Sequence, residues 1–140
     1  MDVICQCGTV KFTTPLPKPL ALYVCHCMQC KRTASAAVNS SAIYPRFAVP
    51  VLPALSVYKY ARNTRFVSYF CKECGTRLIH ITPSKNVVSI KAACIIGLDW
   101  SSAVHLSTLC SMLPISEGSE ATVESPEQTG TAAPAGGDIK

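Results

Sequence analysis

Hydrophobic and polar side chains alternate over short stretches of this chain, and helical periodicity is weak. In the run LSVYKY, residues 55–60, polar Ser56 and Lys59 are interspersed among apolar and aromatic side chains, as in half-buried strands. Comparable β-rich runs, bounded by proline, glycine or asparagine, lie at residues 9–13, 20–24, 34–38, 65–70, 77–82 and 87–95. The pattern predicts a mainly β fold of small antiparallel sheets.

Helices are expected only as short insertions. Prolines at 15, 17, 19, 45, 50 and 53 exclude long helices from those stretches. One helical turn is predicted after Cys27. A second is predicted over residues 100–104, with Asp99 as its N-cap.

Composition and charge divide the chain in two. Its 140 residues suit one domain, and 49% hydrophobic against 15% charged residues indicates a folded one. Residues 117–140 hold five acidic residues, one basic residue and no aromatic, which predicts a flexible acidic tail. Residues 1–116, the predicted domain, carry twelve basic and three acidic side chains, a net charge of +9. This surplus suits an anionic small molecule; nucleic acid is disfavoured because the basic residues are scattered rather than interleaved with aromatics.

The cysteines are the strongest chemical signal. No apolar run reaches the roughly 20 residues of a membrane span, and the start MDVICQCG has no basic and apolar leader pattern. We therefore expect no membrane association and a reducing compartment, the cytoplasm or the nucleus. Nine cysteines also cannot all pair as disulfides, so metal binding is their expected use.

Seven cysteines fall into three clusters: C-x-C-G at Cys5 and Cys7, C-x-C-x-x-C at Cys25, Cys27 and Cys30, and C-x-x-C-G at Cys71 and Cys74. Close pairs let one turn present two thiolates to a single ion, and clustered thiolates favour zinc.

Glycines indicate how the clusters combine. Gly8 and Gly75 directly follow the second cysteine of a pair, where a zinc knuckle often needs positive φ. Cys5, Cys7, Cys71 and Cys74 are therefore predicted to form one closed, structural zinc site.

The middle cluster has Lys31 where a knuckle glycine would stand. Three thiolates and one open position are typical of a catalytic zinc. The alternative is a second structural site, closed by Cys94, Cys110, His80 or His105. With both clusters filled, the chain would bind two zinc ions.

The segments CQCGTVKF, CHCMQCKR, FCKECGTRL and GLD, in this order, resemble the family of glutathione-dependent formaldehyde-activating enzymes, which includes centromere protein V-like domains. GLDWSSAVH followed by LPISEG is similar to fungal members, some of which are associated with secondary metabolism. The resemblance implies a β-tent fold organised around zinc. It assigns Cys5, Cys7, Cys71 and Cys74 to the structural ion and Cys25, Cys27 and Cys30 to the catalytic ion.

The resemblance also implies a carbon–sulfur lyase reaction, the joining of glutathione and formaldehyde to S-(hydroxymethyl)glutathione or its reverse. Glutathione is then the expected small-molecule substrate, with another anionic thiol as the alternative because Ser35, Ala36 and Ser68 replace glycine, serine and arginine of many members.

Three further residues are candidates to assist the reaction. Lys31 and Arg32 follow the last cysteine and would offset the charge of a bound thiolate. His26 lies between two ligands, and alternation points its ring away from them, as a second-shell donor or a packing residue. The competing interpretation is a non-enzymatic zinc module that associates with nucleic acid or protein.

Overall fold

The computed structural model describes residues 1–59 and 66–123, and in these the protein is mainly β. The strands are β1 (Asp2–Ile4), β2 (Lys11–Thr13), β3 (Ala21–Cys25), β4 (Asn39–Pro45), β5 (Leu55–Lys59), β6 (Val67–Cys71), β7 (Arg77–Ile81), β8 (Val87–Lys91) and β9 (Val104–Leu106). The helical segments are α1 (Met28–Ala34) and two 3-10 turns, η1 (Ala92–Cys94) and η2 (Thr108–Cys110). The predicted class, mainly β with short helical insertions, is confirmed.

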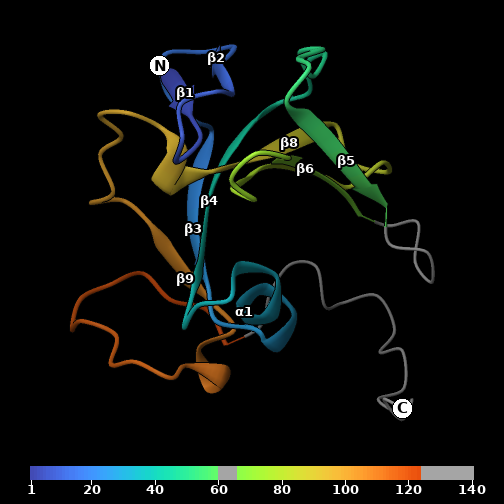
Figure 1. Ribbon diagram of the computed structural model, residues 1–140. Coiled ribbons are helices and arrows are strands. Elements are labelled where there is room, and N and C mark those ends of the chain that lie inside the picture. Colours follow the sequence, from blue (N-terminus) through green and yellow to red (C-terminus); the bar gives the residue numbers. More distant parts are fainter. Residues whose placement is uncertain (60–65, 124–140) are drawn as a thin grey trace, which may run out of the picture.

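The strands form one small and one larger sheet. β1 and β2 make a two-stranded sheet, and the seven-stranded sheet has the order β5-β6-β7-β8-β4-β3-β9. Its neighbouring strands are antiparallel except β3 and β9, which run parallel. In Figure 1, β3, β4 and β9 run down the molecule, β5, β6 and β8 cross near its upper end, and α1 lies at the lower end. The larger sheet therefore bends between these two regions.

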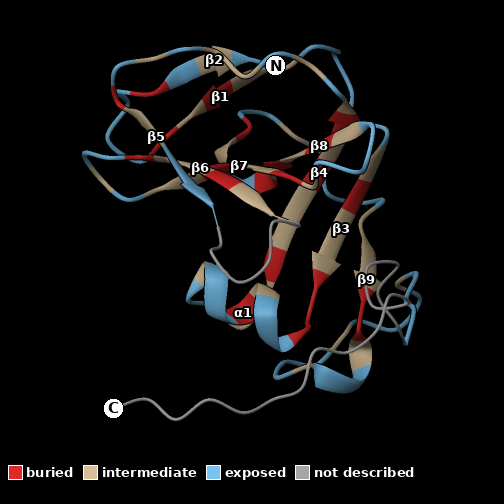
Figure 2. Ribbon diagram, turned by 90° about the vertical axis from the view of Figure 1, so that its right-hand side faces the viewer, coloured by how far each residue is buried: buried red, intermediate tan, exposed pale blue. Residues whose placement is uncertain are grey.

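The two faces of the larger sheet differ in polarity. One face packs the core, whose strand residues include Leu22, Ala42, Tyr44, Ile79, Ile81, Val88 and Ile90. Figure 2 shows these buried positions along β3, β4, β7 and β8. The other face, here called the open face, carries the alternate positions. Its register places Cys25 opposite Asn39, Ser41 opposite Lys91 and His80 opposite Ser89.

The helical turn predicted after Cys27 is confirmed as α1, with Cys27 as its N-cap. The strand predicted at residues 34–38 is wrong. α1 continues to Ala34, and Ser35 closes it in the left-handed conformation at φ 51°. The N–H groups of Ser35 and Ala36 bond to carbonyls of the helix's last turn, so they are not free for a strand. β4 begins only at Asn39.

The helix predicted over residues 100–104 is also wrong. Asp99 does cap locally, since its Oδ1 accepts a hydrogen bond from the Ser101 N–H at 3.0 Å, but this closes a turn. Val104 starts β9, whose pairing with β3 takes the backbone groups that a helix would need. The strand predicted at 87–95 ends at Lys91, and η1 follows. Strands β1, β4 and β9 were not predicted.

The beginning of the expected tail runs beside β9. His105 N–H donates to the Glu120 carbonyl and Thr122 N–H donates to the His105 carbonyl, both at 2.8 Å. Residues 124–140 lie outside the described part of the chain, as do residues 60 and 65 at the ends of two predicted strands. In the described part, none of the helices has both the length and the apolar character needed to cross a membrane.

Candidate metal centres

Four cysteine sulfurs meet between the small sheet and the turn after β6. The Sγ atoms of Cys5, Cys7, Cys71 and Cys74 all lie within 4.8 Å of one another. Cys7 Sγ is 3.5 Å from Cys5 Sγ and 3.8 Å from Cys71 Sγ. Sulfurs around a tetrahedral zinc, with bonds of about 2.3 Å, are about 3.8 Å apart. The donor set and its spacing therefore fit a four-thiolate zinc site.

The glycines that follow these pairs adopt the predicted conformation. Gly8 has φ 78° and Gly75 has φ 75°, both in the left-handed region. Gly8 N–H donates to the Cys5 carbonyl at 3.0 Å, and Gly75 N–H donates to the Cys71 carbonyl at 2.8 Å. These tight turns bring both cysteines of each pair to the same side, as a zinc knuckle requires.

Hydrogen bonds favour thiolates in this four-cysteine cluster. The Val10 N–H donates to Cys5 Sγ at 3.2 Å. Thr76 Oγ1 lies 3.2 Å from Cys74 Sγ, and this hydroxyl contact lowers the pKa of Cys74 to about 6. The same hydroxyl oxygen accepts the Gln6 N–H at 3.2 Å, which links the two knuckles directly.

The other three cysteines meet where β3 passes into α1. Cys25 ends β3, Cys27 caps α1 and Cys30 lies in its first turn, with their Sγ atoms within 4.8 Å of one another. The Cys30 N–H donates to Cys27 Sγ at 3.4 Å. Contacts with the Cys25 and Cys30 thiols lower the pKa of Cys27.

In the described part of the chain, no fourth cysteine, histidine or carboxylate joins this three-cysteine cluster. Of the four suggested closing ligands, Cys94 directs its Sγ at the Arg77 carbonyl, 3.9 Å away. Cys110 is exposed in η2. His105 pairs with His26, and His80 lies on β7. The structure brings none of them into the cluster.

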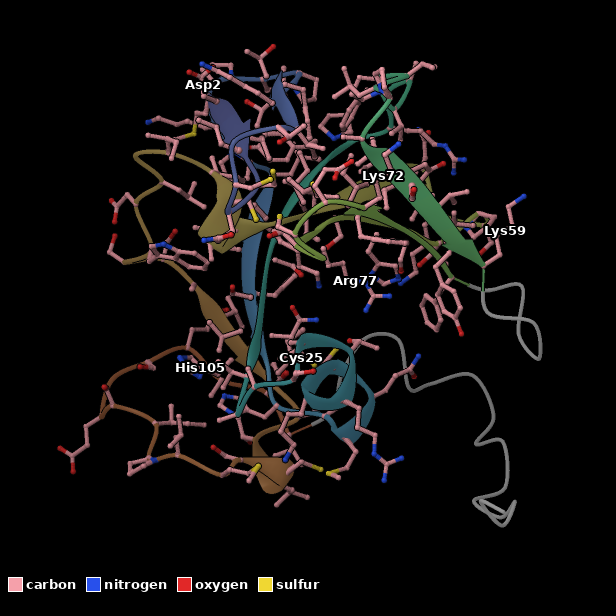
Figure 3. The ribbon with its side chains drawn as sticks, viewed as in Figure 1. Asp2, Cys25, Lys59, Lys72, Arg77 and His105 are labelled. Carbon is pink, nitrogen blue, oxygen red and sulfur yellow. The ribbon has the colours of Figure 1, made fainter. Side chains whose placement is uncertain are left out.

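A pocket of about 310 Å³ opens beside the three-cysteine cluster. Cys25 and Cys30 form one part of its wall. The rest comes from the open face and its neighbours, with Tyr23, Asn39, Ser41, Ile43, His80, Thr82, Lys85, Val87, Ser89 and Leu106. In Figure 3, Cys25 lies beside α1, and Arg77 extends from the sheet above into the space between them. The four elements β3, β4, β7 and β8 thus place a hollow over two of the three sulfurs.

His26 is buried, with an exposed fraction of 2%. Its Nε2 lies 2.9 Å from His105 Nδ1, and the two rings stack. Neither ring nitrogen of His26 joins the sulfur cluster, in line with the predicted orientation.

Lys31 and Arg32 do not line the pocket. Lys31 is buried, and its Nζ donates to the Cys110 carbonyl at 2.6 Å. Arg32 is exposed on the outer side of α1. The cations expected next to the sulfurs from the sequence therefore point elsewhere.

Two basic residues that the sequence reasoning missed, Lys91 and Arg77, lie near the cluster instead, together with His80, which was considered there only as a closing ligand. Lys91 Nζ donates to Asn39 Oδ1 at 2.7 Å, and Arg77 Nη1 donates to the Thr33 carbonyl at 3.3 Å. Burial and the charge of Arg77 lower the pKa of Lys91 to about 8. Burial and the nearby cations lower the pKa of His80 to about 4, so its ring is neutral at pH 7. The alternation of side chains along the predicted strand could have identified Lys91, because it places this residue on the sheet face opposite that of Val88 and Ile90.

Two cysteine clusters that could each hold a metal ion, one of them beside a pocket, define the class: a small β domain with cysteine-rich candidate metal centres. Comparison with known proteins agrees. The family model described as glutathione-dependent formaldehyde-activating enzyme matches residues 1–107. The chain belongs to this family.

A search of curated proteins gave no match. Among solved structures, the fold is similar to the crystal structure of a Rhodobacter sphaeroides protein from a structural genomics programme. The TM-score is 0.56 at 21% identity, over 71% of this chain and 91% of that one. At this identity the likeness concerns the fold alone.

Proposed function

We propose that the protein is a zinc enzyme that joins a small thiol to a carbonyl compound, or cleaves the product, at the three-cysteine cluster. The observation that carries the proposal is that Cys25 and Cys30 line a pocket, with no fourth ligand in the described residues. In this proposal Cys5, Cys7, Cys71 and Cys74 hold a second, structural zinc, so each chain binds two ions.

The reaction is a balanced addition. The thiol sulfur forms a bond to the carbonyl carbon, the C=O π bond breaks, and the thiol proton ends on the former carbonyl oxygen. With glutathione and formaldehyde the product is S-(hydroxymethyl)glutathione, and the reverse direction is a carbon–sulfur lyase reaction. A zinc ion held by Cys25, Cys27 and Cys30 would supply an open, Lewis-acidic position that could acidify a thiol or polarise a carbonyl near neutral pH.

The protein's own residues hold and enclose the reactants. Cys25, Cys27 and Cys30 fix the ion at the junction of β3 and α1. Ile43, Val87 and Leu106 give the pocket apolar walls, whereas Ser41 and Ser89 offer hydroxyls on the open face. Ser68, which stands where many family members have arginine, accepts a hydrogen bond from Arg77 Nη2. The guanidinium of Arg77, on β7, thus reaches the region that arginine occupies in many family members. This supports an anionic thiol as the substrate.

The test measures exchange of the hydroxymethyl group between glutathione and formaldehyde by NMR, with and without protein. Wild-type protein is expected to accelerate exchange, and Cys27→Ala is expected to abolish the acceleration while the four-cysteine site keeps its zinc. Cys110→Ala, which removes an exposed thiol outside both clusters, serves as the matched control and should remain active. An active Cys27→Ala protein would overturn the proposal. Absence of activity with glutathione and with smaller thiols would favour the non-enzymatic module.

A further inference from the structure

Two cations on the open face, Arg77 and Lys91, have no carboxylate partner among the residues that the structure describes. Within residues 1–59 and 66–123, the one ion pair joins Lys11 to Asp2 at the molecule's surface, 3.5 Å apart. Arg77 and Lys91 are half-buried and donate only to neutral groups: the Ser68 hydroxyl, the Thr33 carbonyl and the Asn39 amide oxygen. Withdrawing a charge from water is costly unless an opposite charge is near. An anion is therefore expected beside them.

The three-cysteine cluster supplies the negative charge. Asn39, which accepts from Lys91, stands opposite Cys25 in the β3–β4 register. Thr33, which accepts from Arg77, lies on α1 three residues after Cys30. Lys91 thus approaches the three-cysteine cluster from the strands of the larger sheet, and Arg77 approaches it beside α1. Lys91 interacts electrostatically with both Cys25 and Cys30, and Arg77 with Cys30.

Charge distinguishes the two ligands that a metal in this cluster could take. Three thiolates around a divalent ion carry a net charge of −1. A fourth thiolate makes the centre −2, whereas a neutral carbonyl oxygen leaves it at −1. Two nearby fixed cations favour the more negative centre.

Building on the proposed function, we infer that Arg77 and Lys91 form a cationic site that selects a thiolate, rather than a carbonyl oxygen, as the fourth ligand of the three-cysteine centre. The thiol is then the partner held by the metal, and the carbonyl compound enters the pocket second. Arg77 and Lys91 are positioning residues that act through charge on the metal centre.

The experiment uses full-length protein loaded with Co²⁺ and titrated with 2-mercaptoethanol, whose only ionisable group is its thiol. The sulfur-to-cobalt absorption band reports thiolate binding without any turnover. Arg77→Gln and Lys91→Gln should each weaken binding by about tenfold. The charge-conserving variants Arg77→Lys and Lys91→Arg should recover most of the loss. Imidazole, a neutral metal ligand, should bind wild type and variants with equal affinity.

Arg46→Gln is the matched control. Arg46 also donates to backbone carbonyls, those of Pro83 and Lys85, but lies at the end of β4 away from the sulfurs. Its removal should leave the thiol affinity unchanged. Cobalt content is measured for every variant. If Arg77→Gln does not hold two ions, the comparison of Lys91→Gln with Lys91→Arg tests the inference on its own.

The outcomes separate the two claims. Wild-type protein with two cobalt ions and no thiol binding would overturn the proposed function and this inference with it. Thiol binding that is unchanged in both glutamine variants would overturn the inference and leave the proposed function in place. Equal losses of affinity for 2-mercaptoethanol and for imidazole would show that the two residues only support the structure of the pocket. That result would also overturn the inference.

Discussion

His26 and His105 share a hydrogen bond of 2.9 Å between Nε2 of the first ring and Nδ1 of the second. The bond joins residues 79 positions apart, and it adds to the backbone bond from His26 N–H to the Leu106 carbonyl at 3.0 Å. Burial, followed by the charges of His105 and Lys31, lowers the pKa of His26. The residue between two cluster cysteines is therefore a neutral anchor that fixes the end of β3 to β9.

We predict that His105→Ala destabilises the protein by about 1–3 kcal/mol, because it leaves a ring nitrogen of buried His26 without its partner. Zinc content should not change. Thermal or denaturant unfolding measures the first effect and elemental analysis the second. Loss of one zinc ion from His105→Ala would instead identify His105 as the fourth ligand of the three-cysteine cluster.

Cys71→Ala should prevent stable folding. The four-cysteine cluster joins segments 64 residues apart, and the free energy of binding a structural zinc, about 10 kcal/mol or more, is as large as the usual stability of a small domain. Circular dichroism during chelator treatment of wild type should show the same loss. Cys94→Ala is the control, since its half-buried thiol belongs to neither cluster, and it should remain folded. A folded Cys71→Ala protein would show that this site does not support the fold.

Gly75→Ala should destabilise the protein by about 1–2 kcal/mol, the cost of a left-handed conformation for a residue with a Cβ. The effect should be backbone strain alone, because no atom lies within 4 Å of the added Cβ. Asparagine tolerates this conformation better, so Gly75→Asn should cost less. The denaturant midpoints of wild type, Gly75→Ala and Gly75→Asn measure these effects. Equal stability of all three proteins would contradict the knuckle assignment at this turn.

The protein should become less stable as the pH is lowered, partly because of His80. Its folded pKa is about 4 against an ordinary value of 6.5. Between pH 6.5 and 4 the unfolded chain binds a proton that the folded chain does not, so the free energy of unfolding falls as the pH falls. Burial is the main cause, and Lys91, Arg77 and Lys85 add to it.

Urea unfolding of wild type and His80→Asn at several pH values measures this contribution at equal zinc concentration. The difference in the pH slope between the two proteins should be confined to pH 4–6.5 and should vanish above it. Parallel curves across that window would contradict a neutral, half-buried His80.

The sequence predicted the chemistry of the clusters better than their surroundings. Short cysteine spacings and adjacent glycines are local features, so the two knuckles and the turn after Cys27 were predictable. The limits of α1 were not, because the apolar run at 34–38 has β propensity yet follows a helix that Ser35 closes. Strand β9 was missed since its three residues are stabilised by pairing with distant β3.

The cations were misassigned for a related reason. Lys31 and Arg32 are next to the last cysteine in sequence, but a helix turns successive side chains to different sides. Arg77 and Lys91 reach the cluster only through the order of the larger sheet, which places β8 beside β4 and β7 beside β8. Long-range pairing of this kind leaves no local pattern in one sequence.

The most direct test of the account is the number of zinc ions per chain in wild-type and Cys27→Ala protein purified without chelators. We predict two ions in wild type and one in a folded Cys27→Ala protein. A single ion in wild type that Cys27→Ala does not remove would leave the four-cysteine site alone occupied. That result would contradict a metal centre at Cys25, Cys27 and Cys30, and with it the proposed enzyme.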